Sequence, residues 1–205
     1  MYNCDKEIQK KEIVLTSIDF STRLRIEEYI RNIIICIGDD PKREGLINTP
    51  ARFVKMYEEI FRGYRGLPPK ITCFERKRPG ALILDKGYFY SMCEHHMIPF
   101  FGDYYFGYIP DKLEIGASKI GRTIDYFAAK LQTAENLAYE VLERIEQETH
   151  PLGSILLMSG RHFCKEMRGL KKHNSPFEAI EARGILLKNQ NGCKDEFLMR
   201  IGMRI

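Results

Sequence analysis

Two segments far apart in the sequence carry side chains suited to hold one metal ion. Residues 91–96 read Ser-Met-Cys-Glu-His-His, so Cys93 and His96 form a Cys-x-x-His pair, and Cys164 follows about seventy residues later. Three such protein ligands leave a fourth position open for water, as in catalytic zinc sites. A fold that uses this site must therefore bring residue 164 beside the turn at 93–96.

Polar side chains adjoin both halves of this candidate metal site. Glu94 and His95 lie inside the Cys-x-x-His pair, His162 precedes Cys164, and the chain lacks a Cys-x-x-Cys that would complete a closed structural site. Zinc lowers the pKa of a bound water, and a histidine with an ordinary pKa of about 6.5 can exchange the proton. The pattern predicts hydrolytic chemistry with His95 and His162 in proton transfer, and ordinary polar histidines are the alternative.

Composition restricts the class of protein. Of 205 residues 44% are hydrophobic, which is enough for one substantial core. The net charge of +4 does not indicate a nucleic-acid partner. We see no signal peptide and no run of apolar residues long enough to span a membrane, so we expect a cytoplasmic protein. Six scattered cysteines then favour metal binding over disulfides.

The apolar spacing predicts an N-terminal helical section. Apolar residues recur at steps of three and four over 21–37, which predicts a helix with a broad buried face, and Cys36 reads as part of the core. Thr49 and Pro50 are typical of a helix cap and the first helical residue. We expect an N-terminal arm at 1–20, a helical section at 21–66 and a catalytic domain at 67–205.

After residue 80 the pattern changes to strands, then two helices, then strands. The helices are predicted to start at Ser118, read as an N-cap, and near Thr133. Strands are predicted at 81–90, 100–109, 154–158, 162–167, 179–187 and 197–205. This order indicates an α+β fold, with an antiparallel sheet that packs its helices on one face. The edges of such a sheet favour oligomerisation by sheet extension.

Basic side chains gather at a predicted helix start and on two other elements. Ser118, Lys119 and Arg122 fall in one first turn, where free backbone N–H groups and the helix dipole favour phosphate. Further candidates for holding a polyphosphate are Arg52, Lys55 and Arg168. The alternative is chance, because 32 of the 205 residues are Lys or Arg.

Glu135 has two interpretations. A carboxylate near the start of a helix stabilises the helix dipole, which is a sufficient structural reason. A carboxylate can also accept two hydrogen bonds from the N–H groups of a guanine.

Several motifs together resemble the zinc-dependent GTP cyclohydrolase I family. The likeness runs in consistent order over roughly residues 20–205, and its motifs lie at 40–46, 49–52, 91–102, 107–110, 116–119 and 162–169. It implies the tunnelling fold, with two helices between two strand pairs, assembled as a homodecamer of two pentamers with active sites at subunit interfaces. It also implies conversion of GTP to 7,8-dihydroneopterin triphosphate with release of formate.

The resemblance also implies a role for each matching residue. Zinc (Zn2+) would be held by Cys93, His96 and Cys164, and protons would be moved by His95 and His162. The substrate would be bound by Glu135 at the guanine and by Arg52, Lys55, Ser118, Lys119, Arg122 and Arg168 at the triphosphate, some from a neighbouring subunit, and Glu94 joins this set.

Two segments depart from the family pattern. Residues 132–135 read Gln-Thr-Ala-Glu where Gln-Val-Gln-Glu is usual, and residues 174–184 replace a strand usually rich in Ser and Thr. Two alternatives therefore stay open. One is a divergent tunnelling-fold enzyme that acts on another purine or pterin nucleotide, and the other is a binding module in which zinc is structural.

Overall fold

The computed structural model describes residues 18–78 and 80–203, so most of the predicted arm at 1–20 lies outside the described residues. Contacts divide the chain into two compact units. One contains the described residues up to Glu58 together with Tyr64–Leu67, and the other contains Glu59–Gly63 and the chain from Pro68 onward. The boundary proposed at 66/67 stays a prediction. None of the helices formed by the described residues has the length and apolar character needed to cross a bilayer.

The N-terminal unit contains two helices, α1 (Phe20–Cys36) and most of α2 (Thr49–Ile60). Asp19 caps α1 by accepting a hydrogen bond from the Thr22 N–H, as short polar residues at this position commonly do. The prediction that the first helix buries a broad face is wrong for a single chain, because within the described residues α1 buries only Ile34. Cys36 is exposed, so its assignment to the core is also wrong. Two helices alone offer little surface against which such a face could pack.

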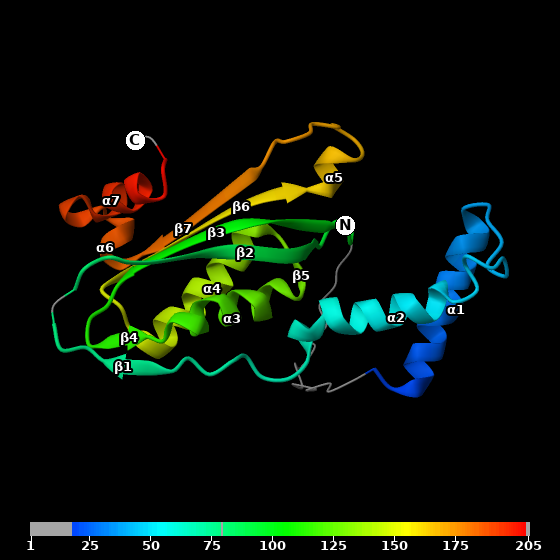
Figure 1. Cartoon of the computed structure of the whole chain (residues 1–205), viewed down its shortest axis with the longest axis horizontal. Coiled ribbons are helices and arrows are strands. Elements are labelled where there is room, and N and C mark those ends of the chain that lie inside the picture. The colour runs from blue at the N-terminus through cyan, green and yellow to red at the C-terminus, as the bar shows by residue number, and fades with distance from the viewer. Residues whose placement is uncertain (1–17, 79, 204–205) are drawn as a thin grey trace, which may run out of the picture. The chain divides into compact units, whose positions relative to one another are not determined.

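The second unit is built on a sheet of five strands within residues 80–203, in the order β5-β2-β3-β6-β7 (Figure 1). All neighbours are antiparallel except β2 and β5, which pair over two residues in parallel. The five strands are β2 (Ile83–Cys93), β3 (Pro99–Ile109), β5 (Leu131–Gln132), β6 (Gly153–His162) and β7 (Phe177–Arg183). A separate two-stranded sheet pairs β1 (Cys73–Glu75) with β4 (Leu113–Ile115).

Helices cover both faces of the larger sheet. The helical segments from residue 62 onward are η1 (Arg62–Tyr64), α3 (Ala117–Ala128), α4 (Ala134–Thr149), α5 (Phe163–Glu166), α6 (Gly184–Leu187), η2 (Gln190–Gly192) and α7 (Cys193–Arg200). Successive strand residues face opposite sides, so Leu156 joins the core under α3 and α4, whereas Ile155 packs with Phe197 of α7. The helix pair between strand pairs confirms the predicted α+β tunnelling-fold architecture. The expectation that helices pack on one face only is wrong, because α6 and α7 cover the other face.

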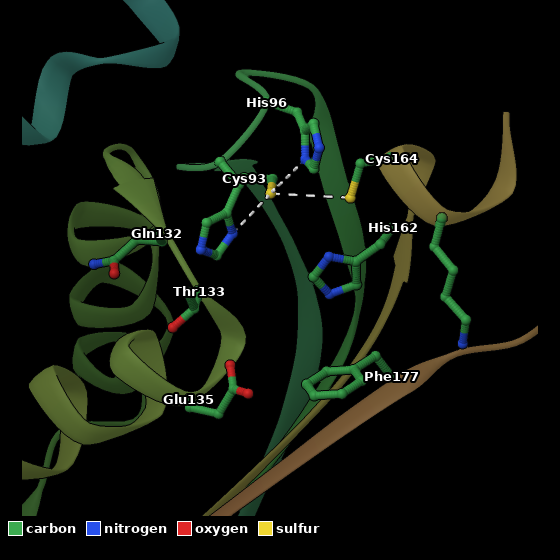
Figure 2. Close-up of a pocket in the computed structure, with 10 residues that line it drawn as sticks. Cys93, His96, Gln132, Thr133, Glu135, His162, Cys164 and Phe177 are labelled. Atoms are coloured by element: carbon green, nitrogen blue, oxygen red, sulfur yellow. Dashed lines mark hydrogen bonds between the residues drawn. The ribbon is translucent and has the colours of Figure 1, made fainter. Parts of the chain in front are cut away.

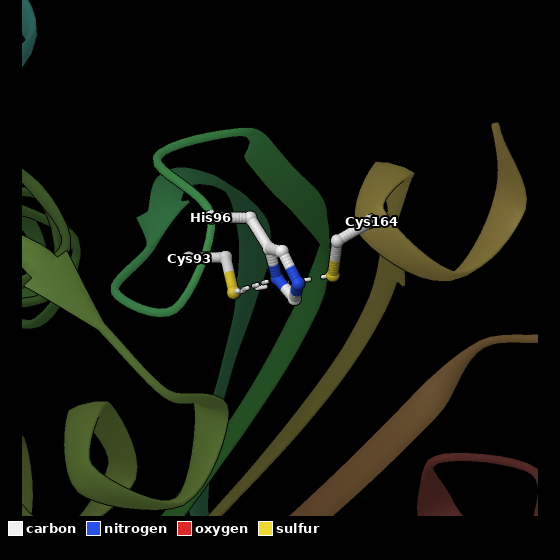
Figure 3. Close-up of side chains that lie close together, drawn as sticks. All are labelled: Cys93, His96 and Cys164. Carbon is white, nitrogen blue, oxygen red and sulfur yellow. Dashed lines mark hydrogen bonds between the residues drawn. The ribbon is translucent and has the colours of Figure 1, made fainter. Parts of the chain in front are cut away.

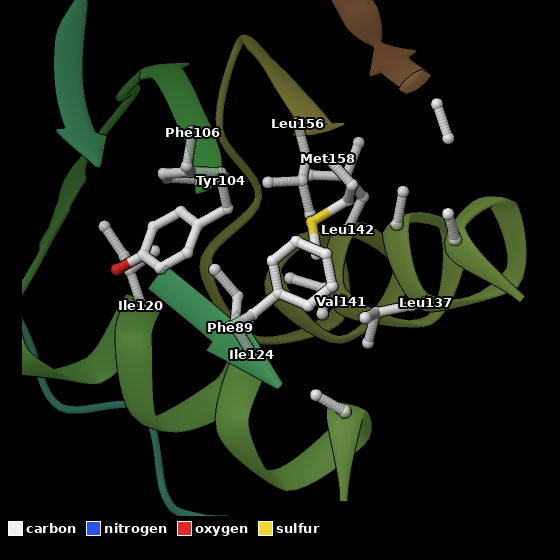
Figure 4. Close-up of a cluster of buried hydrophobic side chains, with 14 of the residues drawn as sticks. Phe89, Tyr104, Phe106, Ile120, Ile124, Leu137, Val141, Leu142, Leu156 and Met158 are labelled. Carbon is white, nitrogen blue, oxygen red and sulfur yellow. The ribbon is translucent and has the colours of Figure 1, made fainter. Parts of the chain in front are cut away.

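The main core lies between the sheet and the two long helices (Figure 4). Phe89 and Phe106 from the strands meet Ile124 of α3 and Leu142 of α4, and all four are fully buried. Each such side chain contributes about 1.5–3 kcal/mol by leaving water. Most of the side chains that support the sheet are therefore apolar residues other than the metal ligands.

Several predicted elements at the end of the chain are wrong. The segment after His162 is α5 and not a strand, and residues 184–187 form α6. Of the strand predicted at 197–205, residues 197–200 belong to α7, and 204–205 lie outside the described residues. Cys193 and Phe197 are four residues apart and both buried, which is helical spacing, but a short apolar run does not distinguish helix from strand by itself. Ser118 is not the N-cap of α3 either, because that position is Gly116.

Candidate active site

The connection between β2 and β3 presents Cys93 and His96 from one tight turn. The Cys93 N–H donates to the Ile98 carbonyl at 3.0 Å, and the Met97 N–H donates back to the Cys93 carbonyl at 2.8 Å. Met97 takes a left-handed backbone conformation, with φ of 52°, which lets the chain reverse. The turn thereby directs a thiol and an imidazole toward the same region.

Strand pairing brings the third candidate ligand to this turn. β3 and β6 are antiparallel, with His162 opposite Phe100, and α5 begins directly after His162. Cys164 therefore lies beside the start of β3. The ligand atoms of Cys93, His96 and Cys164 all lie within 4.8 Å of one another (Figure 3). The predicted convergence of these three residues is present in the structure.

The donor set fits a soft divalent metal ion. The two sulfurs are 3.9 Å apart, and Cys93 Sγ lies 3.9 Å from His96 Nδ1. Tetrahedral bonds of about 2.3 Å to sulfur and 2.0–2.1 Å to nitrogen would separate neighbouring ligand atoms by about 3.6–3.8 Å. Burial and the nearby Cys93 raise the pKa of the Cys164 thiol. A cation between the sulfurs would offset both effects, because it stabilises the thiolates.

His95 and Glu94 lie beside this group. His95 Nδ1 is 3.8 Å from Cys93 Sγ, and His95 Nε2 is 3.8 Å from the Glu94 carboxylate. His95 does not belong to the set of three mutually close ligand atoms. Its position next to a ligand is consistent with a role in proton exchange, which stays a prediction.

A pocket of about 250 Å³ opens beside the three candidate ligands (Figure 2). Its walls come from the β2–β3 turn, the β5–α4 junction, the β6–α5 junction and the start of β7. The lining residues are Cys93, His95, His96, Gln132, Thr133, Glu135, His162, Cys164, Lys165 and Phe177. Four of these, Gln132, Thr133, Lys165 and Phe177, were not among the predicted site residues. Gln132 and Thr133 lie within three residues of Glu135 in the sequence, whereas Phe177 reaches the pocket through the pairing of β7 with β6.

His162 is enclosed by aromatic rings. Phe100 stacks on it with ring centroids 4.5 Å apart and an interplanar angle of 9°, and Phe177 meets it edge-on at 5.6 Å and 82°. Burial lowers the pKa of His162; the Glu135 carboxylate opposes this by raising it, and Lys165 lowers it slightly further. His162 Nε2 is buried and has no hydrogen-bond partner among the described residues. Within the described part of the chain, this buried nitrogen is thus left without a group that satisfies it.

Glu135 reaches the pocket because the β5–α4 junction is fixed. The Glu94 N–H donates to the Gln132 carbonyl at 3.1 Å, and Thr133 caps α4, the helix predicted to start near it, by accepting from the Asn136 N–H at 3.1 Å. Glu135 then falls in the first turn of α4. Ala134, the departure from the family pattern, is buried in the core and does not line the pocket.

The predicted phosphate-binding residues are not gathered at the pocket within the described chain. Ile115, at the end of the strand before α3, donates its N–H to the Tyr108 hydroxyl at 2.9 Å. Tyr108 lies eight residues along β3 from Phe100, which is at the pocket end of that strand. That is about 26 Å at 3.3 Å per strand residue. Ser118 and Lys119, at the start of α3, thus lie toward the opposite end of the sheet from the pocket, and Arg122 lies one turn further along α3.

The other predicted basic residues are divided between the two units. Arg52 and Lys55 lie on α2, within the N-terminal unit. Arg168 follows α5 and lies close enough to Cys164 for its charge to favour the thiolate, although burial is the larger influence on that thiol. Within the part of the chain that the structure describes, Arg168 is thus the member of this basic group whose charge acts on a candidate metal ligand.

Comparison with known proteins decides the family. Residues 26–202 match the family model described as GTP cyclohydrolase I. The chain belongs to the GTP cyclohydrolase I family. Among its relatives is GTP cyclohydrolase 1 of Porphyromonas gingivalis, which is 37% identical over 183 residues that cover 88% of this chain and 94% of the relative.

Further relatives of this GTP cyclohydrolase I family member give the same result. GTP cyclohydrolase 1 of Wolinella succinogenes is 38% identical over 182 residues, covering 87% of this chain and 97% of the relative. Bifunctional protein FolKE of Lactococcus lactis subsp. lactis is 40% identical over 196 residues, covering 93% of this chain and 56% of the relative. These comparisons confirm the resemblance drawn from the motifs and the expectation of an enzyme of this type.

Proposed function

We propose that this protein is a zinc-dependent hydrolase that opens the purine ring of GTP at C8, releases formate and forms 7,8-dihydroneopterin triphosphate. The observation that carries the proposal is one pocket lined by Cys93, His96 and Cys164 together with Glu135 and His162. Membership in the GTP cyclohydrolase I family supports GTP as the substrate.

Cys93, His96 and Cys164 would hold the zinc ion, since two sulfurs and one nitrogen suit it and leave one position open. When bound there, zinc supplies Lewis-acid activation of water for hydrolysis at neutral pH. The neighbouring residues complete the chemistry by binding the base and moving protons.

Glu135 would orient the purine. Its carboxylate accepts hydrogen bonds from the two N–H groups on the guanine edge, and this contact directs the opposite, imidazole side of the base toward the metal ligands. The side chain lies on the first turn of a capped helix, so its position is defined before the substrate binds. Orienting the reacting atom in this way lowers the entropic part of the barrier.

His162 would donate a proton to the ring nitrogen next to C8 as water adds at C8, which lets the ring bond break. A second addition of water then frees formate, after which the ribose rearranges and the pterin ring closes with loss of one water, so that the net reaction consumes one water. The unpartnered Nε2 of His162 supports this role, and His95 would assist in proton exchange from the other side of Cys93.

The triphosphate requires a second copy of the chain under this proposal. In the same chain, Tyr108, whose hydroxyl holds the strand before α3, is about 26 Å along β3 from Phe100, which stacks on His162 of the pocket. Within the described residues, β7 pairs only with β6, and β2 is paired by β5 only at Met92 and Cys93. Copies joined at these edges would bring Ser118, Lys119 and Arg122 of one chain to the pocket of another.

We propose the homodecamer of two pentamers for this assembly, with the active sites at subunit interfaces. Arg52, Lys55 and Arg168 would add positive charge around the triphosphate, and Glu94 would complete the substrate-binding set. Mass measurement of the purified protein in solution distinguishes ten subunits from fewer.

The experiment that tests the function is incubation of purified, metal-analysed protein with GTP. We expect formate together with a pterin that becomes fluorescent after oxidation. Conversion of another purine or pterin nucleotide, with no formate from GTP, would favour the divergent tunnelling-fold enzyme. A protein that unfolds on removal of zinc and converts no nucleotide would favour the structural zinc module.

A further inference from the structure

Phe177 forms an apolar wall of the pocket on the side that faces Glu135 (Figure 2). It is the first residue of β7, and 41% of its surface is exposed although it is large and apolar. It also lies in the segment where this chain departs from the Ser- and Thr-rich strand that is usual in the family. The proposed roles of the ligands, Glu135 and His162 leave this side chain unexplained.

The position of Phe177 is fixed by two sets of contacts. Phe177 pairs with Gly160 of β6, so β7 holds it beside the end of the strand that carries His162. Lys165 Nζ donates to the Ser175 carbonyl at 3.0 Å and to the Ser175 hydroxyl at 2.6 Å. Since Lys165 directly follows Cys164, the approach to Phe177 is tied to the helix that presents a metal ligand.

The angle between the two rings has a consequence for a flat substrate. The planes of Phe177 and His162 are 82° apart, and Phe100 stacks on His162 from its own side. A heteroaromatic ring stacked parallel to Phe177 would be nearly perpendicular to the imidazole. The lone pair of a ring nitrogen lies in the plane of the substrate ring, and the Nε2–H bond of His162 lies in the plane of the imidazole. A proton passed from His162 to the substrate would follow the line where these two planes intersect.

We propose that Phe177 is a substrate-positioning residue that stacks on the base of the nucleotide and turns the edge of that base toward His162. Stacking accepts any purine, because every purine has a flat π-face. Glu135 would then select guanine by its N–H groups, while Phe177 selects a planar ring and sets its tilt. This inference rests on the proposed function, which places a purine in the pocket.

The sequence offers a direct test, because it contains no tryptophan. Phe177→Trp places a single indole in the pocket wall, and we expect its fluorescence to be quenched in a saturable way by GTP. The matched control is Ile180→Trp on the same strand, where the side chain is 44% exposed and faces the other side of the sheet. We expect no saturable quenching in the control.

Affinity provides a second measurement. In a His162→Ala background, in which turnover is expected to be lost, Phe177→Ala should weaken GTP and ITP binding by the same factor, about tenfold. Glu135→Gln should instead reduce the preference for GTP over ITP, because ITP lacks the amino group of guanine.

The outcomes separate this inference from the proposed function. Unquenched Phe177→Trp in a protein that still converts GTP to formate and a pterin would overturn the stacking role and leave the function intact. Equal quenching of Ile180→Trp would also overturn it, because the signal would not be local. A Phe177→Ala variant that changes the assembly size but keeps its GTP affinity would assign the ring to a contact between copies. Saturable quenching without conversion would support stacking while removing the proposed reaction.

Discussion

The sulfur atoms of Cys93 and Cys164 lie 3.9 Å apart, although 71 positions separate the two residues along the chain. This distance is well beyond a disulfide bond of about 2.05 Å and close to the spacing of two thiolates on one tetrahedral metal ion. The pairing of β3 with β6 creates the relationship, since it places the end of β6 beside the turn after β2.

We expect Cys164→Ser to lose zinc. Removing one thiolate leaves two protein ligands, and the loss of zinc affinity should exceed the factor of about 100 known for residues that only support ligands. Metal content per chain, measured after dialysis, checks this. Cys36→Ser is the matched control, because that thiol is exposed and lies on α1. Normal zinc content in Cys164→Ser would remove it from the ligand set.

His162→Ala should keep zinc and GTP but lose turnover. A positioned proton donor contributes about 10²–10⁴-fold to the rate, so kcat should fall by that factor while the metal content stays at its wild-type value. Single-turnover formate release measures the effect. His173→Ala, in the exposed segment after α5, serves as the control. Full activity of His162→Ala would exclude it as the proton donor.

Glu135→Ala should weaken GTP binding at the base. If the carboxylate accepts two hydrogen bonds from guanine, its removal should abolish most of the preference for GTP over ITP in competition binding. The helix-dipole interpretation predicts a different result, namely a loss of about 0.3–1 kcal/mol in the free energy of unfolding with the guanine preference unchanged. Measuring both quantities on one variant decides between the two roles.

Removal of the metal should abolish activity and leave the second unit folded. Its core includes the fully buried Phe89, Ile124 and Leu142, and of the candidate ligands only Cys93 belongs to it, with Cys164 packed at its edge. Circular dichroism before and after chelation, followed by recovery of activity with added zinc, tests this. Cooperative unfolding on chelation would indicate a structural metal site.

Phe197 and Met199 test the assignment of α7. In a strand these residues would share one face, whereas on a helix they point in different directions. Phe197 is fully buried and Met199 is 61% exposed. Phe197→Ala should therefore cost about 3–5 kcal/mol in the free energy of unfolding, and Met199→Ala should stay within about 0.5 kcal/mol. Denaturant titration of both variants gives the comparison, and equal losses would contradict the helix.

Local signals predicted those parts of the structure that depend on neighbours in sequence. The helix predicted to start near Thr133 is α4, with Thr133 as its cap, because a helix start is decided within one turn. The short apolar segment that ends the chain was predicted as a strand, because its spacing fits either period and only packing of Phe197 on the sheet selects the helix. The buried face expected for α1 failed for the same reason, since burial depends on what lies opposite.

The residues by themselves determined the chemistry available to this protein. Two thiols and an imidazole at these spacings specify a soft metal site wherever they meet, because ligand preference is a property of the side chains. Only the tertiary structure decided which other groups share the pocket. Phe177 stands beside His162 because β7 pairs with β6 in one register, and the start of α3 is remote because β3 extends between them. Such neighbours depend on strand pairing between distant segments, which no local pattern encodes.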